Sequence, residues 1–301
     1  MAQAVTTVID EQLCTGCGLC VRVCPSQTIS MRGGKAVVSG ERSLNCGHCQ
    51  AVCPEGAVRV GSLDPEQSRF STFELDPAWL PFGRCDLAGL ARLMASRRSC
   101  RNYSDQPVPR EMLADLVKIG LSAPSGTNSQ RWSFTVLPHR QRVLELAQGI
   151  GAVMRQFNRM AEKAWLRKLM RLLGKPQLDD YFREHYQSVK KGLEQWEQQG
   201  VDRLFHGAPA AILVGSAPGA SCPAEDALLA SGHMLLAAHA MGLGTCLIGY
   251  AVEVLARKPE LAWRLGVGRR EKIHAVIALG WPREKYQTIT GRRAPILRWA
   301  D

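Results

Sequence analysis

The chain has 301 residues, and 46% of them are hydrophobic, a share typical of packed globular proteins. This composition excludes collagen, long coiled coil and disorder as descriptions of the whole chain. Lys and Arg number 38 against 27 Asp and Glu, and the resulting charge of +11 favours anionic partners without choosing among them.

Seven of the eleven cysteines lie between Cys14 and Cys53, separated mostly by two or three residues. This spacing indicates metal ligation rather than a disulfide framework, and it predicts a reducing compartment, the cytoplasm. The first residues reach Asp10 and Glu11 without a basic start or an apolar core, so we expect no secretory signal. The longest apolar run, residues 227–241, is too short for a membrane span.

The cysteines form two similar blocks, CTGCGLCVRVCP at residues 14–25 and CGHCQAVCP at residues 46–54. Iron in a cluster takes soft thiolate ligands, and CxxCxxC presents three of them on one tight loop. A zinc site would instead need paired CxxC units. The pattern therefore favours iron–sulfur clusters over zinc or structural cysteines.

The two blocks resemble those of the two-cluster bacterial ferredoxins, so residues 1–65 are expected to form a ferredoxin-like 4Fe-4S domain. The resemblance implies crossed ligation, in which each block supplies three ligands to one cluster and its last cysteine to the other. One 4Fe-4S cluster would be held by Cys14, Cys17, Cys20 and Cys53, and the second by Cys24, Cys46 and Cys49.

The second cluster lacks one thiol, because Ser43 stands where the family has a cysteine, three residues before Cys46. A serine oxygen is a harder donor that ligates iron less readily. Three outcomes are open: Ser43 or a solvent ligand completes the cluster, a three-iron cluster forms, or the second site is unstable. We favour a four-iron cluster with a non-cysteine ligand.

After the cysteine blocks, residues 62–84 hold three prolines and no sustained hydrophobic period, so residues 66–85 are expected to be a linker. A second domain, residues 86–301, should follow. Helical spacing appears at residues 86–99, with Leu87, Leu90, Leu93 and Met94 on one face, and again at residues 111–123. Strands are expected at residues 132–137, 211–216, 244–249 and 272–280, and two or three helices at residues 141–200. The fold class is α+β.

Five downstream segments carry chemistry. RRSCRNY, residues 97–103, gathers guanidiniums suited to a phosphate or an electron-rich ring, although basic residues at a helix end also complement its dipole. The loop APSGTNSQRW, residues 123–132, offers small residues and amides that let backbone approach a ring, the alternative being a simple turn. The other segments are GLGTCLIGY at residues 242–250, LGWP at residues 279–282 and GRRAP at residues 291–295.

The order and spacing of these segments resemble the nitroreductase family of flavin enzymes, over roughly residues 86–301. The whole chain thus resembles a ferredoxin–nitroreductase fusion. The resemblance implies a mixed, mainly antiparallel sheet flanked by helices, with FMN bound at the boundary of a homodimer, for which residues 227–241 are a candidate dimer helix. It places FMN against Arg97, Arg98, Ser99, Arg101, Pro124, Ser125, Gly126, Asn128, Gln130, Leu247, Ile248, Gly249 and Arg293, with Arg292 as a weaker candidate. The sequence departs from the family at Arg131, often proline, and at Leu247, commonly tryptophan.

Residues 155–191 form a basic segment, with ten basic residues against four acidic ones and an apolar stripe between the charges. The stripe could pack as a lid over the flavin, face a partner, or lie on a membrane. We expect packing on the protein itself.

Other features carry less information. The glycines near residues 242 and 266 lack the spacing of a dinucleotide fingerprint, and nothing resembles a nucleic-acid reading module. Four isolated cysteines, Cys85, Cys100, Cys222 and Cys246, are interpreted as structural, buried thiols. Because no carboxylate or histidine falls in a matching motif, the catalytic residues stay unassigned.

Together these features predict an FMN-dependent oxidoreductase, in which iron–sulfur clusters pass single electrons to FMN for two-electron reduction of a nitro, quinone or other conjugated organic acceptor. External ferredoxin or a similar low-potential donor would feed the clusters, so that NAD(P)H would be dispensable. One alternative is a non-catalytic electron carrier that docks a protein partner through its basic helices. Another is the same chemistry run as an oxidation.

Overall fold

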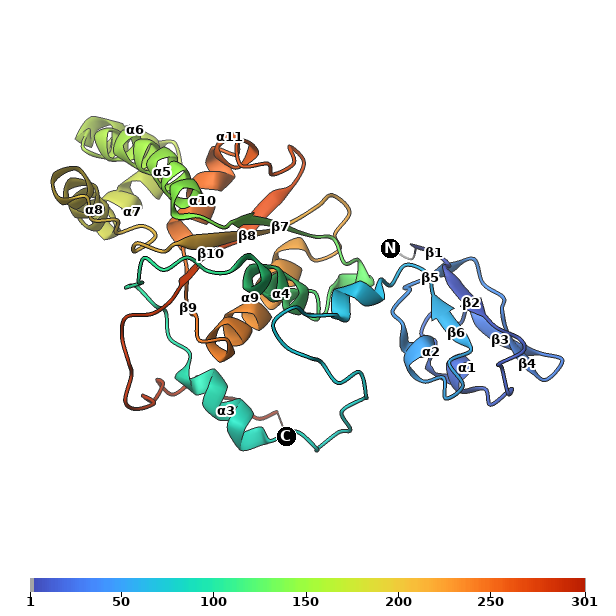
Figure 1. Cartoon of the computed structure of the whole chain (residues 1–301). Coiled ribbons are helices and arrows are strands. Elements are labelled where there is room, and N and C mark those ends of the chain that lie inside the picture. Colours follow the sequence, from blue (N-terminus) through green and yellow to red (C-terminus); the bar gives the residue numbers. More distant parts are fainter. Residues whose placement is uncertain (1–2, 301) are drawn as a thin grey trace.

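The computed structural model describes residues 3–300, in which a small amino-terminal domain lies beside a larger one (Figure 1). Residues 1, 2 and 301, at the outer ends of the two predicted domains, lie outside the described part. Within that part, no helix combines the length and apolarity needed to cross a membrane.

The small domain consists of three antiparallel two-stranded ladders and two short helices. The ladders pair β1 (Gln3–Ala4) with β5 (Arg42–Ser43), β2 (Thr7–Ile9) with β6 (Val58–Val60), and β3 (Ile29–Arg32) with β4 (Lys35–Val38), and the helices are α1 (Leu19–Val23) and α2 (His48–Ala51). Strands this short supply few apolar side chains. Cysteines therefore contribute to the core, where Cys14, Cys20 and Cys49 are buried together with Ile29 and Val58.

Glycines shape the turns that carry these cysteines. Gly16 has a φ of +75°, and a Cβ there would come within 2.0 Å of the Gly34 carbonyl oxygen, so only glycine fits this turn. Gly18 and Gly47 are also left-handed, and each directly precedes one of the two helices. The two CGxC turns therefore have the same local conformation.

A buried carboxylate ties the linker to the large domain. After the short 3₁₀ helix η1 (Pro65–Ser68), the chain runs along α4 (Arg110–Gly120). Asp115 of α4 accepts hydrogen bonds from the backbone N–H groups of Ser71, at 2.9 and 3.0 Å, and of Thr72, at 2.8 Å. Burial alone would raise the pKa of Asp115, but the hydrogen bonds from Ser71 and Thr72 outweigh it and hold that pKa below its ordinary value.

The large domain is built on one antiparallel sheet with the strand order β7-β8-β10-β9. The strands are β7 (Trp132–Leu137), β8 (Ala210–Ser216), β9 (Gly244–Leu247) and β10 (Lys272–Gly280). Helices cover both faces of the sheet, so β8, the run AAILVGS, is buried along its whole length. The prediction of a mainly antiparallel sheet flanked by helices is confirmed.

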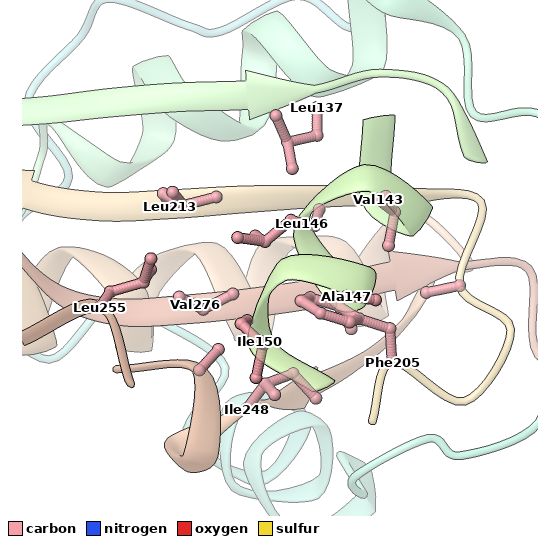
Figure 2. Close-up of a cluster of buried hydrophobic side chains, with 14 of the residues drawn as sticks. Leu137, Val143, Leu146, Ala147, Ile150, Phe205, Leu213, Ile248, Leu255 and Val276 are labelled. Carbon is pink, nitrogen blue, oxygen red and sulfur yellow. The ribbon is translucent and has the colours of Figure 1, made fainter. Parts of the chain in front are cut away.

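Alternation along the strands divides the core into two layers. Ile212 and Val214 of β8 face α4 and α9 (Pro223–Ala240), whereas Leu213 lies in the layer on the opposite face. There, α5 (Arg140–Ala161) contributes Val143, Leu146, Ala147 and Ile150 at helical spacing (Figure 2). The same face is covered by α10 (Gly249–Arg257) and α11 (Glu260–Trp263).

Several expected boundaries differ from the structure. The helices expected at residues 86–99 and 111–123 end earlier, at Ser96 and Gly120. The strand expected at residues 244–249 ends at Leu247, because Gly249 already begins α10. Residues 141–200 form four helices rather than two or three: α5, α6 (Ala164–Leu172), α7 (Gln177–Glu184) and α8 (Tyr186–Gln199). Gly174 and Pro176 divide α6 from α7 in a stretch that reads as one basic pattern.

The basic segment packs on the protein, but its helix α6 leaves apolar side chains exposed. Leu166 and Met170 of α6 lie against the cluster that contains Leu178 and Tyr186. The exposed large apolar side chains of α6 and the turn after it are Trp165, Leu169, Leu172 and Leu173. Intramolecular packing therefore accounts for part of the apolar stripe.

Two apolar arms extend from the large domain (Figure 1). One is the stretch before and including α3 (Leu87–Ser96), where the predicted apolar face is not buried and Leu87 is 75% exposed. The other is the carboxyl-terminal tail, where Ile296 and Trp299 are more than 80% exposed. Contiguous exposed apolar surface of this kind is uncommon on a soluble protein.

Cys85 and Cys222 are exposed, so the interpretation of the isolated cysteines as buried thiols is wrong for these two. Cys85 lies in the linker and Cys222 at the start of α9, where no sheet or helix covers them. Cys100 and Cys246 are buried, as expected.

Replacing Asp115 by alanine should free the linker. The substitution removes the acceptor of three main-chain hydrogen bonds, and hydrogen bonds to a charged group are each worth about 1.5–3 kcal/mol. We expect trypsin to cut after Arg69 and Arg84 faster in Asp115→Ala than in the wild type. Glu111→Ala, at an exposed position of the same helix, is the control. Equal cleavage rates would contradict the tether.

Candidate functional site

Thiols from both cysteine blocks line one small cavity in the small domain. Its walls include Cys14, Cys17, Cys20 and Cys53, together with Leu19, Ala57 and Val58. Cys53 comes from the second block and the other three thiols from the first. The cavity therefore groups the residues that crossed ligation assigns to one cluster.

A second cavity contains the remaining predicted ligands. Cys24 of the first block lines it with Cys46, Cys49 and Ser43, beside Thr28 and His48. Ser43 is buried, and its hydroxyl accepts a hydrogen bond from the Asn45 N–H at 3.0 Å. Whether this oxygen ligates iron stays a prediction.

The surroundings of the thiols fit sulfur ligation. The backbone N–H groups of Ala36 and Gly16 lower the pKa of Cys14, which favours the thiolate that a metal needs. Burial raises the pKa of Cys20 and of Cys49. Among residues 3–300, no three His, Cys, Asp or Glu side chains converge tightly enough for a single metal ion; the thiols surround two hollows instead.

A third cavity, of about 670 Å³, opens in the large domain where α3, the end of α9, β9 and the tail meet. Its volume lies in the range of about 300–1,000 Å³ that is common for small-molecule sites. The wall includes Arg92, Ser96, Arg98, His239 and Gly244, with Pro282 and residues 286–289 of the tail. A basic wall beside small residues fits a phosphorylated ring compound.

The arginine segment is held along β9. Ser99 pairs with Thr245 in a parallel bridge, and the Cys100 N–H donates to the Thr245 carbonyl at 2.8 Å. The buried Tyr103 hydroxyl donates to the Cys100 carbonyl at 2.9 Å, and it also lies 3.3 Å from the Ala278 carbonyl of β10. Residues 97–101 and 244–247 thus lie side by side.

The predicted FMN-binding residues of the arginine segment and of residues 247–249 differ in what their side chains contact. Arg98 lines it and donates to the Thr290 carbonyl of the tail at 3.4 Å, two residues before the exposed Arg292 and Arg293. Arg97, Ser99 and Arg101 approach the buried Cys246 on β9. Leu247 is half-exposed and Gly249 has open space around it, whereas the Ile248 side chain is packed in the core (Figure 2).

The loop of residues 124–130 is fixed by Asp226, near the start of α9. The Asp226 carboxylate accepts from the Gly126 N–H at 2.8 Å and from the Ser129 hydroxyl at 3.4 Å. A Cβ on Gly126 would approach the Cys222 sulfur to 2.8 Å, so this close approach requires glycine. Pro124 and Ser125 lead into the short 3₁₀ helix η2 (Gly126–Asn128).

Backbone strain is concentrated in this loop. Thr127, Asn128 and Gln130 all have positive φ values, between 47° and 51°. Left-handed conformations cost non-glycine residues of order 1–3 kcal/mol each, and they persist where the surroundings impose them. Hydrogen bonds of Gln130 to Ser125 and Asn128 are among the contacts that impose them here.

Asn128 joins this loop to the small domain. Its Nδ2 donates to the carbonyl of Leu44 at 2.9 Å and to that of Asn45 at 3.2 Å. Leu44 and Asn45 are the two residues between Ser43 and Cys46, which both line the second cysteine cavity. The loop thus lies directly against the wall of that cavity.

The predicted FMN-binding residues form two groups rather than one. Asp226, which holds the loop, lies thirteen positions before His239, which lines the arginine cavity, and both are on α9. A rise of 1.5 Å per residue separates them by about 20 Å. Within one chain, the loop therefore does not reach the arginine cavity.

Sequence reasoning missed Asp226, Asp115 and Tyr103. Asp226 belongs to the acidic first turn of α9 after Pro223, which signals a helix start but not a loop anchor. Asp115 is a charged residue on an otherwise regular amphipathic helix. Only the long-range hydrogen bonds in the structure show that these side chains fix the linker, the loop and the arginine segment.

Comparison with known proteins identifies both parts. A model of the nitroreductase family matches residues 94–281. The chain belongs to the nitroreductase family. A model of 4Fe-4S dicluster domains matches residues 6–64, so the ferredoxin–nitroreductase fusion expected from the sequence is confirmed.

Two curated relatives match part of the chain. The chain is 27% identical over 179 residues to a 4-nitrobenzoate reductase from Nocardioides sp., covering 51% of this chain and 66% of the relative. It is 28% identical over 193 residues to an NADH dehydrogenase from Thermus thermophilus, covering 63% of this chain and 84% of that one. The fold is similar to that of a nitroreductase with bound FMN from Bacteroides fragilis, with a TM-score of 0.50, 20% identity and coverage of 69% of this chain and 98% of the other.

Ser43→Cys should strengthen the second cluster site. A thiolate in place of the hydroxyl gives four soft ligands around that cavity, and soft ligands suit iron–sulfur clusters. We expect anaerobically purified Ser43→Cys to retain more iron than the wild type after incubation with a chelator. Ser39→Cys adds a thiol at an exposed position outside both cavities and should change nothing. Unchanged iron retention in Ser43→Cys would argue against a role of this position in ligation.

Proposed function

We propose that this protein is an FMN-dependent oxidoreductase in which two iron–sulfur clusters of the small domain supply the electrons for reduction of a conjugated organic acceptor. The observation that carries the proposal is the pair of hydrogen bonds from Asn128, in the candidate flavin loop, to Leu44 and Asn45 beside the second cysteine cavity. They bring the candidate electron donor and the candidate flavin loop into direct contact.

FMN, when bound, accepts electrons one at a time or in pairs and passes them to an organic acceptor as hydride. The task of the chain is to hold it. Arg98 and its neighbours Arg97 and Arg101 would bind the phosphate and offset negative charge on the ring, because guanidiniums make strong hydrogen bonds to such anions. Asn128 and Gln130, fixed in strained conformations, would set the position of the loop over the ring.

The proposed FMN site needs two copies of the chain. One chain keeps its loop and its arginine cavity about 20 Å apart along α9. The exposed apolar side chains of α3 and of the tail would be covered by a second copy, and two of them, Tyr286 and Ile289, line the arginine cavity. A symmetric dimer would place the loop of each chain over the cavity of the other.

A nitro compound, a quinone or another conjugated electrophile is the proposed acceptor. The similarity to a protein named 4-nitrobenzoate reductase supports this class. Reduced ferredoxin or a similar low-potential donor is the proposed source of electrons, and the dicluster domain supports it. Lack of turnover with every nitroarene, quinone and enone tested would instead favour an electron carrier that serves a protein partner.

Loss of the clusters should prevent the reduction of FMN by reduced ferredoxin. In the double variant Cys17→Ala/Cys49→Ala, each cysteine cavity loses one thiol, whereas the large domain is unchanged. We expect FMN content to stay at the wild-type level and turnover with reduced ferredoxin to fall to background. Cys85→Ala, at an exposed linker position, is the control. If the double variant turned over with reduced ferredoxin at the wild-type rate, the proposed electron route would be refuted.

Arg98→Ala should weaken FMN binding. A hydrogen bond to a charged group contributes about 1.5–3 kcal/mol, so the dissociation constant of FMN should rise by roughly ten- to a hundredfold. Fluorescence titration of the FMN-free protein measures this change. Arg84→Ala, at an exposed position outside the arginine cavity, should bind FMN like the wild type. Equal affinities of the Arg98 variant and the wild type would remove this arginine from the site.

A further inference from the structure

We infer that electrons cross between chains: the small domain of one chain serves the FMN whose phosphate is held by the arginines of a second copy. The inference rests on the proposed function and adds which chain reduces which flavin. It follows from two observations: the small domain contacts the loop of residues 124–130 in its own chain, and that loop lies far from the arginine cavity of the same chain.

The small domain is attached to the loop of its own chain. Asn128 donates to Leu44 and Asn45, and the Gln3 side chain lies 3.5 Å from the Asn128 carbonyl. Asn45 lines the second cysteine cavity and directly precedes Cys46. These contacts all lie on the side of the second cavity. The second cavity is therefore the exit point for electrons.

The linker also holds the small domain near the loop. Before the chain reaches α3, Ser71 and Thr72 are bound to Asp115 on α4, and the loop begins a few residues after α4 ends. Lys118 of the same helix also donates to the Arg69 carbonyl, at 2.6 Å. The small domain is thus held on the side of the large domain where the loop lies (Figure 1).

The arginine cavity of the same chain lies at the opposite end of α9. Asp226 and His239 mark the two ends, about 20 Å apart. Electron transfer slows steeply with distance, so a flavin under the loop is served far better than a flavin remote from it. If the loop of one chain covers the arginine cavity of the other, each small domain lies nearest the FMN bound by its partner's arginines.

Mixed dimers separate transfer between chains from transfer within a chain. In the complementing dimer, one chain carries Cys17→Ala/Cys49→Ala and the other carries Arg98→Ala/Arg101→Ala. Its one intact arginine cavity belongs to the chain without clusters and is covered by the loop of the chain with clusters. We expect reduced two-cluster ferredoxin to bleach the absorbance of its bound FMN.

The reciprocal dimer pairs a wild-type chain with a chain that carries all four substitutions. It should bind the same amount of FMN as the complementing dimer, because it also has one intact arginine cavity. Its flavin, however, lies against a small domain without clusters. We expect bleaching to drop to the rate of the homodimer lacking clusters, which sets the background for direct reduction.

Two different affinity tags isolate each mixed dimer, and flavin absorbance is followed anaerobically within a single turnover. Bleaching in the complementing dimer alone supports transfer between chains. Bleaching in the reciprocal dimer alone, in both dimers or in neither overturns it, provided that the wild-type homodimer is bleached. A wild-type homodimer that binds no FMN, or whose FMN is not reduced faster than background, refutes the proposed function itself.

Discussion

The two hydrogen bonds from Asn128 to the carbonyls of Leu44 and Asn45 are the contact on which the functional account depends. They join the nitroreductase domain to the two residues between Ser43 and Cys46. Asn128 itself has a strained, left-handed backbone conformation. A single amide would hold two domains weakly, since each such bond contributes only about 1 kcal/mol. The tether at Asp115 adds a second attachment, and together they orient the small domain toward the loop.

The anchoring of this loop explains how the strain is maintained. The Asp226 carboxylate, in the first turn of α9, accepts a hydrogen bond from the Gly126 N–H, and one face of α9 packs in the core with α4 and the sheet. The rigid three-layer core thus fixes a loop whose residues would otherwise relax. The arginine segment is fixed in a comparable way at the other end of α9, through β9 and Tyr103. One helix therefore sets the distance between the two halves of the proposed flavin site.

Sequence patterns predicted what depends on local rules. The two cysteine blocks, the helices α3 and α4 and the strand β8 all follow from spacing and residue type. The division of residues 141–200 into four helices depended on Gly174 and Pro176, which a broad basic pattern concealed. The roles of Asp115, Asp226 and Asn128 depend on partners 43 to 100 positions away. No local pattern records such partners, so the meeting of loop and small domain could not be predicted.

The central claim is that one chain binds both iron–sulfur clusters and FMN, and the most direct test is the composition of the protein itself. Iron, inorganic sulfide and flavin should be quantified on full-length protein purified without oxygen, and electron paramagnetic resonance should be recorded after reduction. The account predicts sulfide and FMN in the same preparation, with iron sufficient for two clusters and paramagnetic signals from both. A colourless protein that contains neither iron nor FMN would contradict it.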